Sequence, residues 1–201
     1  MNICLINGSP RPKGGVSGRI LAALAQNLGT EHHYTRYDAA AGTSAGFIEA
    51  LCGSEVIVMA FPLYADGIPA HLLRLLTAAE TSISGAAKGA VLYVAVNNGF
   101  YEASQNVLAL SMARLFGEKA GLVWGQGIAI GGGGMLESIP LTSPLMVSIR
   151  IALSKLADSI RSKSTVESLL TQPSIPRRFY FMGANMNWRK LAKQNGVSLK
   201  K

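Results

Sequence analysis

The sequence predicts an α/β protein in which a parallel sheet is covered by helices on both faces. Short, almost wholly apolar runs alternate along the chain with longer stretches that have helical periodicity. The apolar runs are continuous, as strands are when both faces of a sheet are buried. Right-handed crossovers between parallel strands then leave few possible topologies.

The first half of the chain contains three of the expected strands. The run 3–6 is apolar and precedes a turn-forming segment, so we expect a strand there and a helix over 18–25. Residues 31–37 alternate as in a half-exposed strand, and a short helix is expected over 43–52. Residues 56–60 are apolar throughout, which predicts a buried strand.

The second half of the chain continues the same alternation. A proline opens the next helical stretch, and a third fully apolar run follows it. We expect a helix over 69–82, a strand over 90–96, a helix over 102–120, a strand over 123–130, a helix over 144–162 and a linker over 162–178.

Length and composition indicate one folded domain with an appendage. The chain has 201 residues, of which 49% are hydrophobic and 15% are charged, so a well-buried core is expected and disorder is not. We expect a domain over 1–165 and a basic extension over 166–201 that packs on the domain or on a dimer partner. The N-terminus lacks the pattern of a signal peptide, and no apolar run approaches the ~20 residues of a membrane span. A cytoplasmic protein without a membrane partner is expected.

Two cysteines, Cys4 and Cys52, have no metal-site spacing between them or to a histidine. Each lies in an apolar or helical stretch, where a lone cysteine is usually a small buried hydrophobe. We therefore expect reduced, buried thiols and no metal site.

Positive charge is concentrated in the C-terminal extension. Residues 1–170 carry 12 basic and 11 acidic side chains, whereas 171–201 carry seven basic and none acidic. Such a tail is compatible with nucleic acid, an anionic membrane or a phosphorylated ligand. No nucleic-acid motif accompanies it, so no nucleic-acid partner is expected. The favoured interpretation is a helix over 185–195, docked through Trp188 and Leu191 with its basic side chains in solvent.

The loop after the first strand has the composition of a phosphate site. A strand, a loop of small, hydroxyl and basic residues, and a helix place backbone N–H groups and a positive helix end together. The spacing fits neither a Walker loop nor a dinucleotide fingerprint, so a terminal monophosphate is the expected ligand. The alternative is an ordinary strand-to-helix turn with Ser17 as the helix N-cap. The side-chain donors expected for the phosphate are Ser9, Arg11, Lys13 and Ser17.

Two further loops are expected at the same edge of the sheet, where ligands of open α/β sheets bind. The segment 61–69 follows the third strand and 97–102 follows the fourth, and both combine aromatic rings with exposed backbone or amide groups. Together they are suited to a flat heterocycle, which with the phosphate suggests a mononucleotide cofactor. The alternative is that Phe61, Tyr64, Phe100 and Tyr101 are ordinary packing aromatics. The run of four glycines at 131–134 is expected to be a flap over the ring or a plain flexible turn.

These three motifs, in this order, resemble the flavodoxin-like NAD(P)H-dependent FMN reductases over residues 1–165. The resemblance implies a five-stranded parallel sheet in the order 2-1-3-4-5, noncovalent FMN, NADPH or NADH as electron donor, a cytoplasmic setting and a homodimer. It implies that the four loop residues above hold the FMN phosphate. It also implies that the isoalloxazine is lined by Pro62, Leu63, Tyr64 and Gly67 on one side and by Asn98, Gly99 and Phe100 on its other edge.

The expected reaction is hydride transfer from the nicotinamide to the flavin, followed by electron delivery to a small acceptor such as a flavin or quinone. The flavin carries this chemistry, so no catalytic side chain is named. Pro12 and the pair Gly14–Gly15 depart from the usual loop and leave fewer side-chain donors for FMN. The alternatives are a flavodoxin-type electron carrier, which the sequence pI of about 9.7 disfavours, and a flavin-free regulatory protein on the same fold.

Overall fold

The computed structural model of the protein describes residues 1–11 and 15–197. Strands and helices alternate as the sequence predicts. The strands are β1 (Asn2–Asn7), β2 (His33–Asp38), β3 (Val56–Pro62), β4 (Val91–Asn97), β5 (Val123–Ile130) and β6 (Leu169–Thr171). The helices are α1 (Val16–Leu28), α2 (Ser44–Leu51), α3 (Ala70–Ala86), α4 (Val107–Lys119), α5 (Gly133–Ser138), α6 (Val147–Arg161) and α7 (Arg177–Gln194), with 3-10 turns at Ala103–Asn106 and Pro144–Met146.

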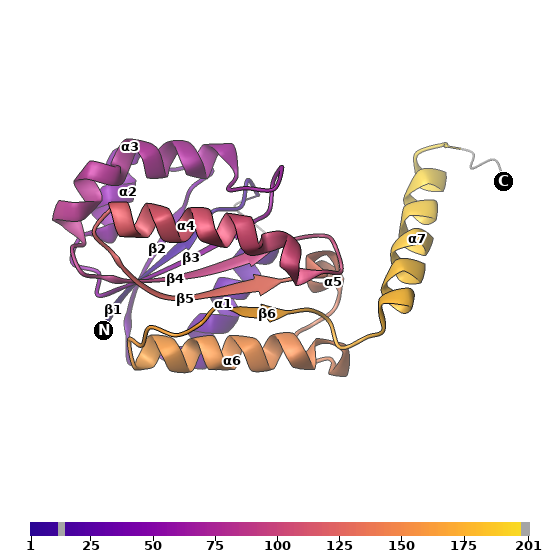
Figure 1. The fold of residues 1–201 in the computed structure, drawn as a ribbon. Coiled ribbons are helices and arrows are strands. Elements are labelled where there is room, and N and C mark those ends of the chain that lie inside the picture. Colours follow the sequence, from indigo (N-terminus) through magenta and orange to yellow (C-terminus); the bar gives the residue numbers. More distant parts are fainter. Residues whose placement is uncertain (12–14, 198–201) are drawn as a thin grey trace.

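All strands of the sheet are parallel, in the order β2-β1-β3-β4-β5-β6. Helices α2, α3 and α4 cover one face, and α1, α5 and α6 cover the other (Figure 1). The β3 and β4 side chains are buried almost throughout, because each of these strands lies between two others and under helices on both faces. The fold class and the order of the first five strands are therefore as predicted.

The sixth strand corrects the predicted count of five. Leu169–Thr171 pairs with β5 at Ile128–Ile130 and extends the sheet within the segment expected to be a linker. Two further differences are the short helix α5, which begins inside the run of four glycines, and α7, which begins eight residues before the expected start. Cys4 is buried as expected, but Cys52 is exposed, because it follows the end of α2 at the surface.

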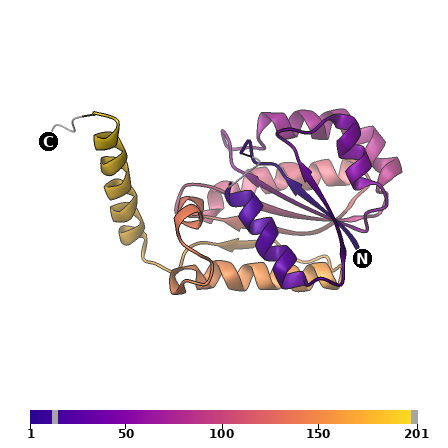
Figure 2. The ribbon, with the colours of Figure 1, turned by 180° about the vertical axis from the view of Figure 1, so that it is seen from behind.

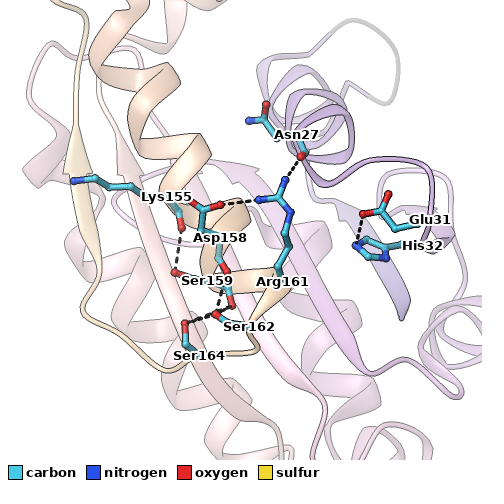
Figure 3. A network of polar contacts seen from close by, with 9 residues as sticks. All are labelled: Asn27, Glu31, His32, Lys155, Asp158, Ser159, Arg161, Ser162 and Ser164. Carbon is cyan, nitrogen blue, oxygen red and sulfur yellow. Dashed lines mark hydrogen bonds and ion pairs between the residues drawn. The ribbon is translucent and has the colours of Figure 1, made fainter.

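The ends of α1 and α6 that lie away from the loops after the strands are tied by a polar network (Figure 3). The Arg161 guanidinium donates to the Asn27 carbonyl at the end of α1 and to Asp158 Oδ1, one turn back on α6. The Ser162 hydroxyl continues the network to Ser164 at 3.1 Å. These contacts fix α6 against α1, on the face of the sheet that also carries α5.

Helix α7 projects away from the domain in both views (Figures 1 and 2). Its first turn is attached to the loop after β4: the Tyr180 hydroxyl donates to the Gly99 carbonyl at 2.6 Å, and Arg177 pairs with Glu102. No residue of α7 is buried, and Trp188 is 70% exposed. The expectation that Trp188 docks the helix onto its own domain is therefore wrong, whereas packing on a second copy stays a prediction.

Among the described residues, no helix has both the length and the apolar character that crossing a membrane requires.

Candidate flavin phosphate site

The loop from β1 to α1 is held by close backbone packing. Gly8 N–H donates to the Ala60 carbonyl at 2.8 Å, and a Cβ at Gly8 would lie 2.5 Å from the Leu72 side chain, so only glycine fits there. Burial lowers the pKa of His71, which lies on α3 against the Gly8 backbone. The neutral ring adds no charge beneath the loop.

Helix α1 begins at Val16, with Gly15 as its N-cap. Ser17 is therefore the second residue of the helix, and its hydroxyl accepts a hydrogen bond from Asn97 Nδ2 at 3.0 Å. The alternative that Ser17 is the N-cap is wrong. Because no side chain of residues 1–11 or 15–197 caps this helix end, the N–H groups of its first turn can bind an anion.

Ser9 shapes the remainder of the described loop. Its Oγ accepts from the Arg11 N–H at 3.1 Å, and its own N–H donates to Asn7 Oδ1 at 3.2 Å. A Cβ at Gly15 would lie 2.8 Å from Ser9 Oγ, which explains why the chain needs glycine at this approach. Lys13, predicted as a phosphate ligand, lies outside the described residues.

A cavity of about 170 Å³ opens at this loop and brings together five of the predicted site residues. Its volume and polar lining suit a phosphate group rather than a whole nucleotide. Ser9, Arg11 and Ser17 line it from the first loop, and Pro62 and Tyr64 line it from the loop after β3.

Two polar residues of this cavity, Asn97 and Glu137, are not among the predicted site residues. Asn97, the last residue of β4, is buried, and its amide donates to the Phe61 carbonyl as well as to Ser17. Glu137 on α5 also lines the cavity, and its carboxylate lies 3.5 Å from Arg11 Nη1. The position of Asn97, a polar residue at the end of an apolar strand, could have indicated a role in the site. Nothing in the sequence around Glu137 indicated that it lines the cavity.

The loop after β3 turns sharply beside the cavity. Tyr64 and Gly67 exchange backbone hydrogen bonds of 3.0 and 3.1 Å, and the two residues between them, Ala65 and Asp66, have φ of 45° and 60°. The Tyr64 side chain is half exposed at the rim. Leu63 packs its side chain against the core, so its backbone is what it offers to a ligand.

The loop after β4 is fixed by the run of four glycines. Gly133 N–H donates to the Asn98 carbonyl at 2.6 Å, and Gly132 N–H donates to the Phe100 carbonyl at 2.5 Å. A Cβ at Gly131 would lie 2.2 Å from the Tyr101 carbonyl oxygen, so this contact requires glycine. The glycines thus support the neighbouring loop and begin α5, and the expectation of a flap or a plain turn is corrected.

Asn98 in this loop has an unsatisfied buried atom. Its amide donates to the Glu102 carbonyl at 3.1 Å, but within residues 1–11 and 15–197 its Oδ1 is buried without a hydrogen-bond partner. Phe100 is exposed. Asn98, Gly99, Phe100, Leu63 and Gly67 do not line the phosphate cavity, although they follow neighbouring strands at the same edge of the sheet.

Solved structures confirm the fold that these loops sit on. The chain superposes on an NADH:FMN oxidoreductase with a TM-score of 0.64 and 14% identity over 83% of this chain and 91% of the other. It matches an NADPH-quinone reductase from P. pentosaceus (TM-score 0.58, 18% identity, 78% and 98% covered) and a WrbA-like flavodoxin from Agrobacterium tumefaciens (0.54, 16%, 80% and 98%). The chain has the flavodoxin-like fold.

The flavodoxin-like fold agrees with the resemblance to FMN reductases that the three loop motifs indicate. No protein-family model matches the chain, and no curated protein matches it.

Proposed function

We propose that the protein is an FMN-dependent oxidoreductase that takes hydride from NADPH or NADH and passes electrons to a small acceptor such as a flavin or quinone. The observation that carries the proposal is the cavity where Ser9, Arg11 and Ser17 meet the loop that begins at Pro62. Structural neighbours described as an NADH:FMN oxidoreductase, a quinone reductase and an azoreductase support the same class of reaction.

The described residues fit FMN at both of its ends. The Ser9 and Ser17 hydroxyls, the Arg11 guanidinium and the first turn of α1 offer donors to a phosphate. At the ring end, Asn98 Oδ1 is buried and has no hydrogen-bond partner within residues 1–11 and 15–197, so it would accept from an N–H on the edge of the isoalloxazine. Tyr64 and Phe100, both exposed, offer aromatic faces beside it.

When bound, FMN supplies a redox centre that accepts hydride and returns electrons singly or in pairs. The protein's own contribution is to position the cofactor and to neutralise the charge of its phosphate. Arg11 offsets the phosphate charge, while Asn97 holds the Ser17 hydroxyl in place from the end of β4. No side chain is assigned as an acid or base, and the homodimer and cytoplasmic setting remain predictions from the resemblance.

The test is a visible spectrum of the purified full-length protein with and without added FMN, followed by anaerobic addition of NADPH or NADH. We expect a bound-flavin spectrum that the nicotinamide bleaches. Bound flavin that neither nicotinamide bleaches would instead support the one-electron carrier of flavodoxin type. Absence of flavin binding would exclude both and leave the flavin-free regulatory protein.

A further inference from the structure

A second cavity, distinct from the phosphate cavity, lies between α1 and the carboxyl end of β2. Its volume is about 300 Å³, and it shares only Gly15 with the phosphate cavity. Gly18 and Ala22 of α1 form one wall, and Arg36 and Asp38 of β2 form the other. Arg19 and Leu21 of α1 also line the cavity, so the small Gly18 and Ala22 leave room between larger side chains.

This cavity continues along β2 into another of about 590 Å³, with which it shares Ala22 and Arg36. Tyr34 and Ala25 line the second part. Because side chains two apart on a strand share a face, Tyr34, Arg36 and Asp38 all point toward α1. The result is one groove, with an aromatic ring, a guanidinium and a carboxylate in a row opposite two alanines.

Asp38 is connected to the phosphate loop through a single buried residue. Asn7 Nδ2 donates to Asp38 Oδ1 at 2.7 Å, and Asn7 Oδ1 accepts from the Ser9 N–H. The carboxylate is therefore held in position while it remains exposed to the groove. It follows Gly15, the N-cap of α1, by 23 residues.

Arg36 is exposed, and in the part of the chain that the structure describes its guanidinium makes no ion pair or hydrogen bond. Tyr34 is held by its hydroxyl, which donates to the Gly29 carbonyl at 2.8 Å, so its ring has a fixed position beside the groove. A free cation next to a fixed carboxylate and a fixed ring is a set of groups that recognises a nucleotide.

We infer that the groove between α1 and β2 binds an adenine nucleotide moiety of a dinucleotide. In strand–helix–strand units that bind dinucleotides, an acidic residue after the second strand accepts a ribose hydroxyl, and an arginine near it accommodates a ribose 2′-phosphate. The loop after β1 lacks the glycine fingerprint of those units, so the comparison concerns these two side chains alone. Asp38 and Arg36 occupy these two roles here. The base lies farther along the groove, between Tyr34 and the small Ala22 and Ala25.

An adenine nucleotide moiety occurs in two cofactors, FAD and NADP(H). The choice of source rests on the proposed function, whereas binding of the adenylate itself does not. The inference therefore stands or falls separately from the flavin assignment.

The first experiment titrates adenosine 2′,5′-bisphosphate and AMP into the full-length protein by calorimetry, with and without FMN. We expect both to bind, and Arg36→Ala to weaken the bisphosphate by about tenfold or more, as loss of a bond between charged groups does. Asp38→Asn, which keeps the shape of the side chain, should weaken both ligands. Arg74→Ala, which removes an exposed arginine of α3 on the other face, is the matched control and should change neither.

The second experiment compares FMN with FAD in the FMN-free protein and measures KM for NADPH in the FMN-loaded protein. If FAD is the source, Asp38→Asn weakens FAD and leaves FMN unchanged, and FAD competes with the bisphosphate. If NADP(H) is the source, FMN-loaded protein still binds the bisphosphate, and Arg36→Ala raises KM without changing kcat.

Failure of either ligand to bind, or equal binding by wild type, Arg36→Ala and Asp38→Asn, would overturn the inference. A normal FMN spectrum in that case shows that the flavin site survives. Bisphosphate binding without any flavin binding would instead overturn the proposed function alone. Circular dichroism establishes that each variant is folded.

Discussion

Ser17 lies inside α1 and not at its cap, which changes what its hydroxyl does. It accepts from the Asn97 amide and retains its own proton for a ligand, so it joins the end of β4 to the phosphate cavity. Sequence reasoning identified Ser9 and Ser17 from residue type and place after the first strand. It did not identify Asn97, because an amide within a loop motif gives no indication of which neighbour it will contact.

The first prediction concerns the two hydroxyls. Ser9→Ala and Ser17→Ala should each weaken FMN binding by about 1–3 kcal/mol, the range for a lost hydrogen bond to a charged group. Quenching of FMN fluorescence on titration measures the affinity. Ser111→Ala, on the surface of α4 with its hydroxyl bonded to the Val107 carbonyl, is the control and should bind FMN normally. Unchanged affinity in both loop variants would contradict the assignment.

Glu137 introduces a negative charge into a cavity assigned to a phosphate. It lies 3.5 Å from Arg11, and both side chains are largely exposed, so solvent screens the pair. Glu137→Gln should strengthen FMN binding by roughly 0.2–1 kcal/mol, because it removes a competitor for Arg11 and a repulsion to the phosphate.

The matched control for this second prediction is Glu118→Gln, which breaks the Arg114 ion pair on α4. Its FMN affinity should equal that of the wild type in the same fluorescence titration. Weaker FMN binding by Glu137→Gln would show that the carboxylate helps to hold the cofactor.

At the scale of elements, the sequence was informative wherever a strand was long and apolar. The strands β3, β4 and β5 lie within a few residues of their predicted bounds, because burial on both faces leaves a continuous apolar run. The helix α6 also lies within a few residues of its predicted bounds, because its buried residues recur at helical spacing. The short strand β6 has three residues and no periodicity of its own. Its pairing with β5 is decided by tertiary contacts that a local pattern does not contain.

The expectation that the glycine run at 131–134 forms a flap or a plain flexible turn is wrong for a related reason. Composition alone indicates flexibility, but three of the four glycines are required by their surroundings: Gly131 approaches Tyr101, Gly133 approaches Asn98, and Gly132 has a φ of 68° beside Pro173. Close approach between loops far apart in the chain is invisible in one sequence. The same contacts bring Glu137 to the phosphate cavity.

Tyr93 ties the centre of the sheet to the end of α6. Its buried hydroxyl donates to the Ser159 carbonyl at 2.7 Å and lies 3.1 Å from the Ser164 carbonyl, and burial raises its pKa to about 12. Tyr93→Phe should lower the free energy of unfolding by about 0.5–1.5 kcal/mol, because the buried hydrogen bond to the Ser159 carbonyl is lost. Urea denaturation followed by circular dichroism measures this.

The same residue predicts how stability depends on alkaline pH. An unfolded tyrosine ionises near pH 10, so the contribution of Tyr93 is complete below that pH and is lost as pH rises from about 10 to about 12. The alkaline decline should be smaller in Tyr93→Phe than in the wild type. An identical decline in the two proteins would show that Tyr93 is not buried as described.

At the scale of the whole molecule, charge and exposed aromatics are concentrated on α7. The extension carries seven basic residues and no acidic one, and five of the basic residues lie within α7, whose apolar side chains remain in solvent. The basic helix was predicted from the sequence, but the expectation that Trp188 docks it rested on the usual burial of tryptophan side chains. The first turn contacts the domain through Arg177 and Tyr180.

Solvent access to Trp188 tests this arrangement. The chain has two tryptophans, so Trp124→Phe leaves Trp188 as the single emitter. Because Trp188 is 70% exposed, acrylamide should quench its fluorescence about as effectively as that of a free tryptophan. Strong protection in dilute protein would contradict the free helix, whereas protection that grows with protein concentration would show that a second copy covers it.

The central claim is that the β1–α1 loop holds the phosphate end of FMN, and the affinity of FMN relative to riboflavin tests it most directly. Riboflavin has the same ring and lacks the phosphate. Two or more charged hydrogen bonds to Ser9, Ser17 and Arg11 predict that the wild type binds FMN about a hundredfold more tightly. Equal affinity for FMN and riboflavin in the wild-type protein would contradict the claim.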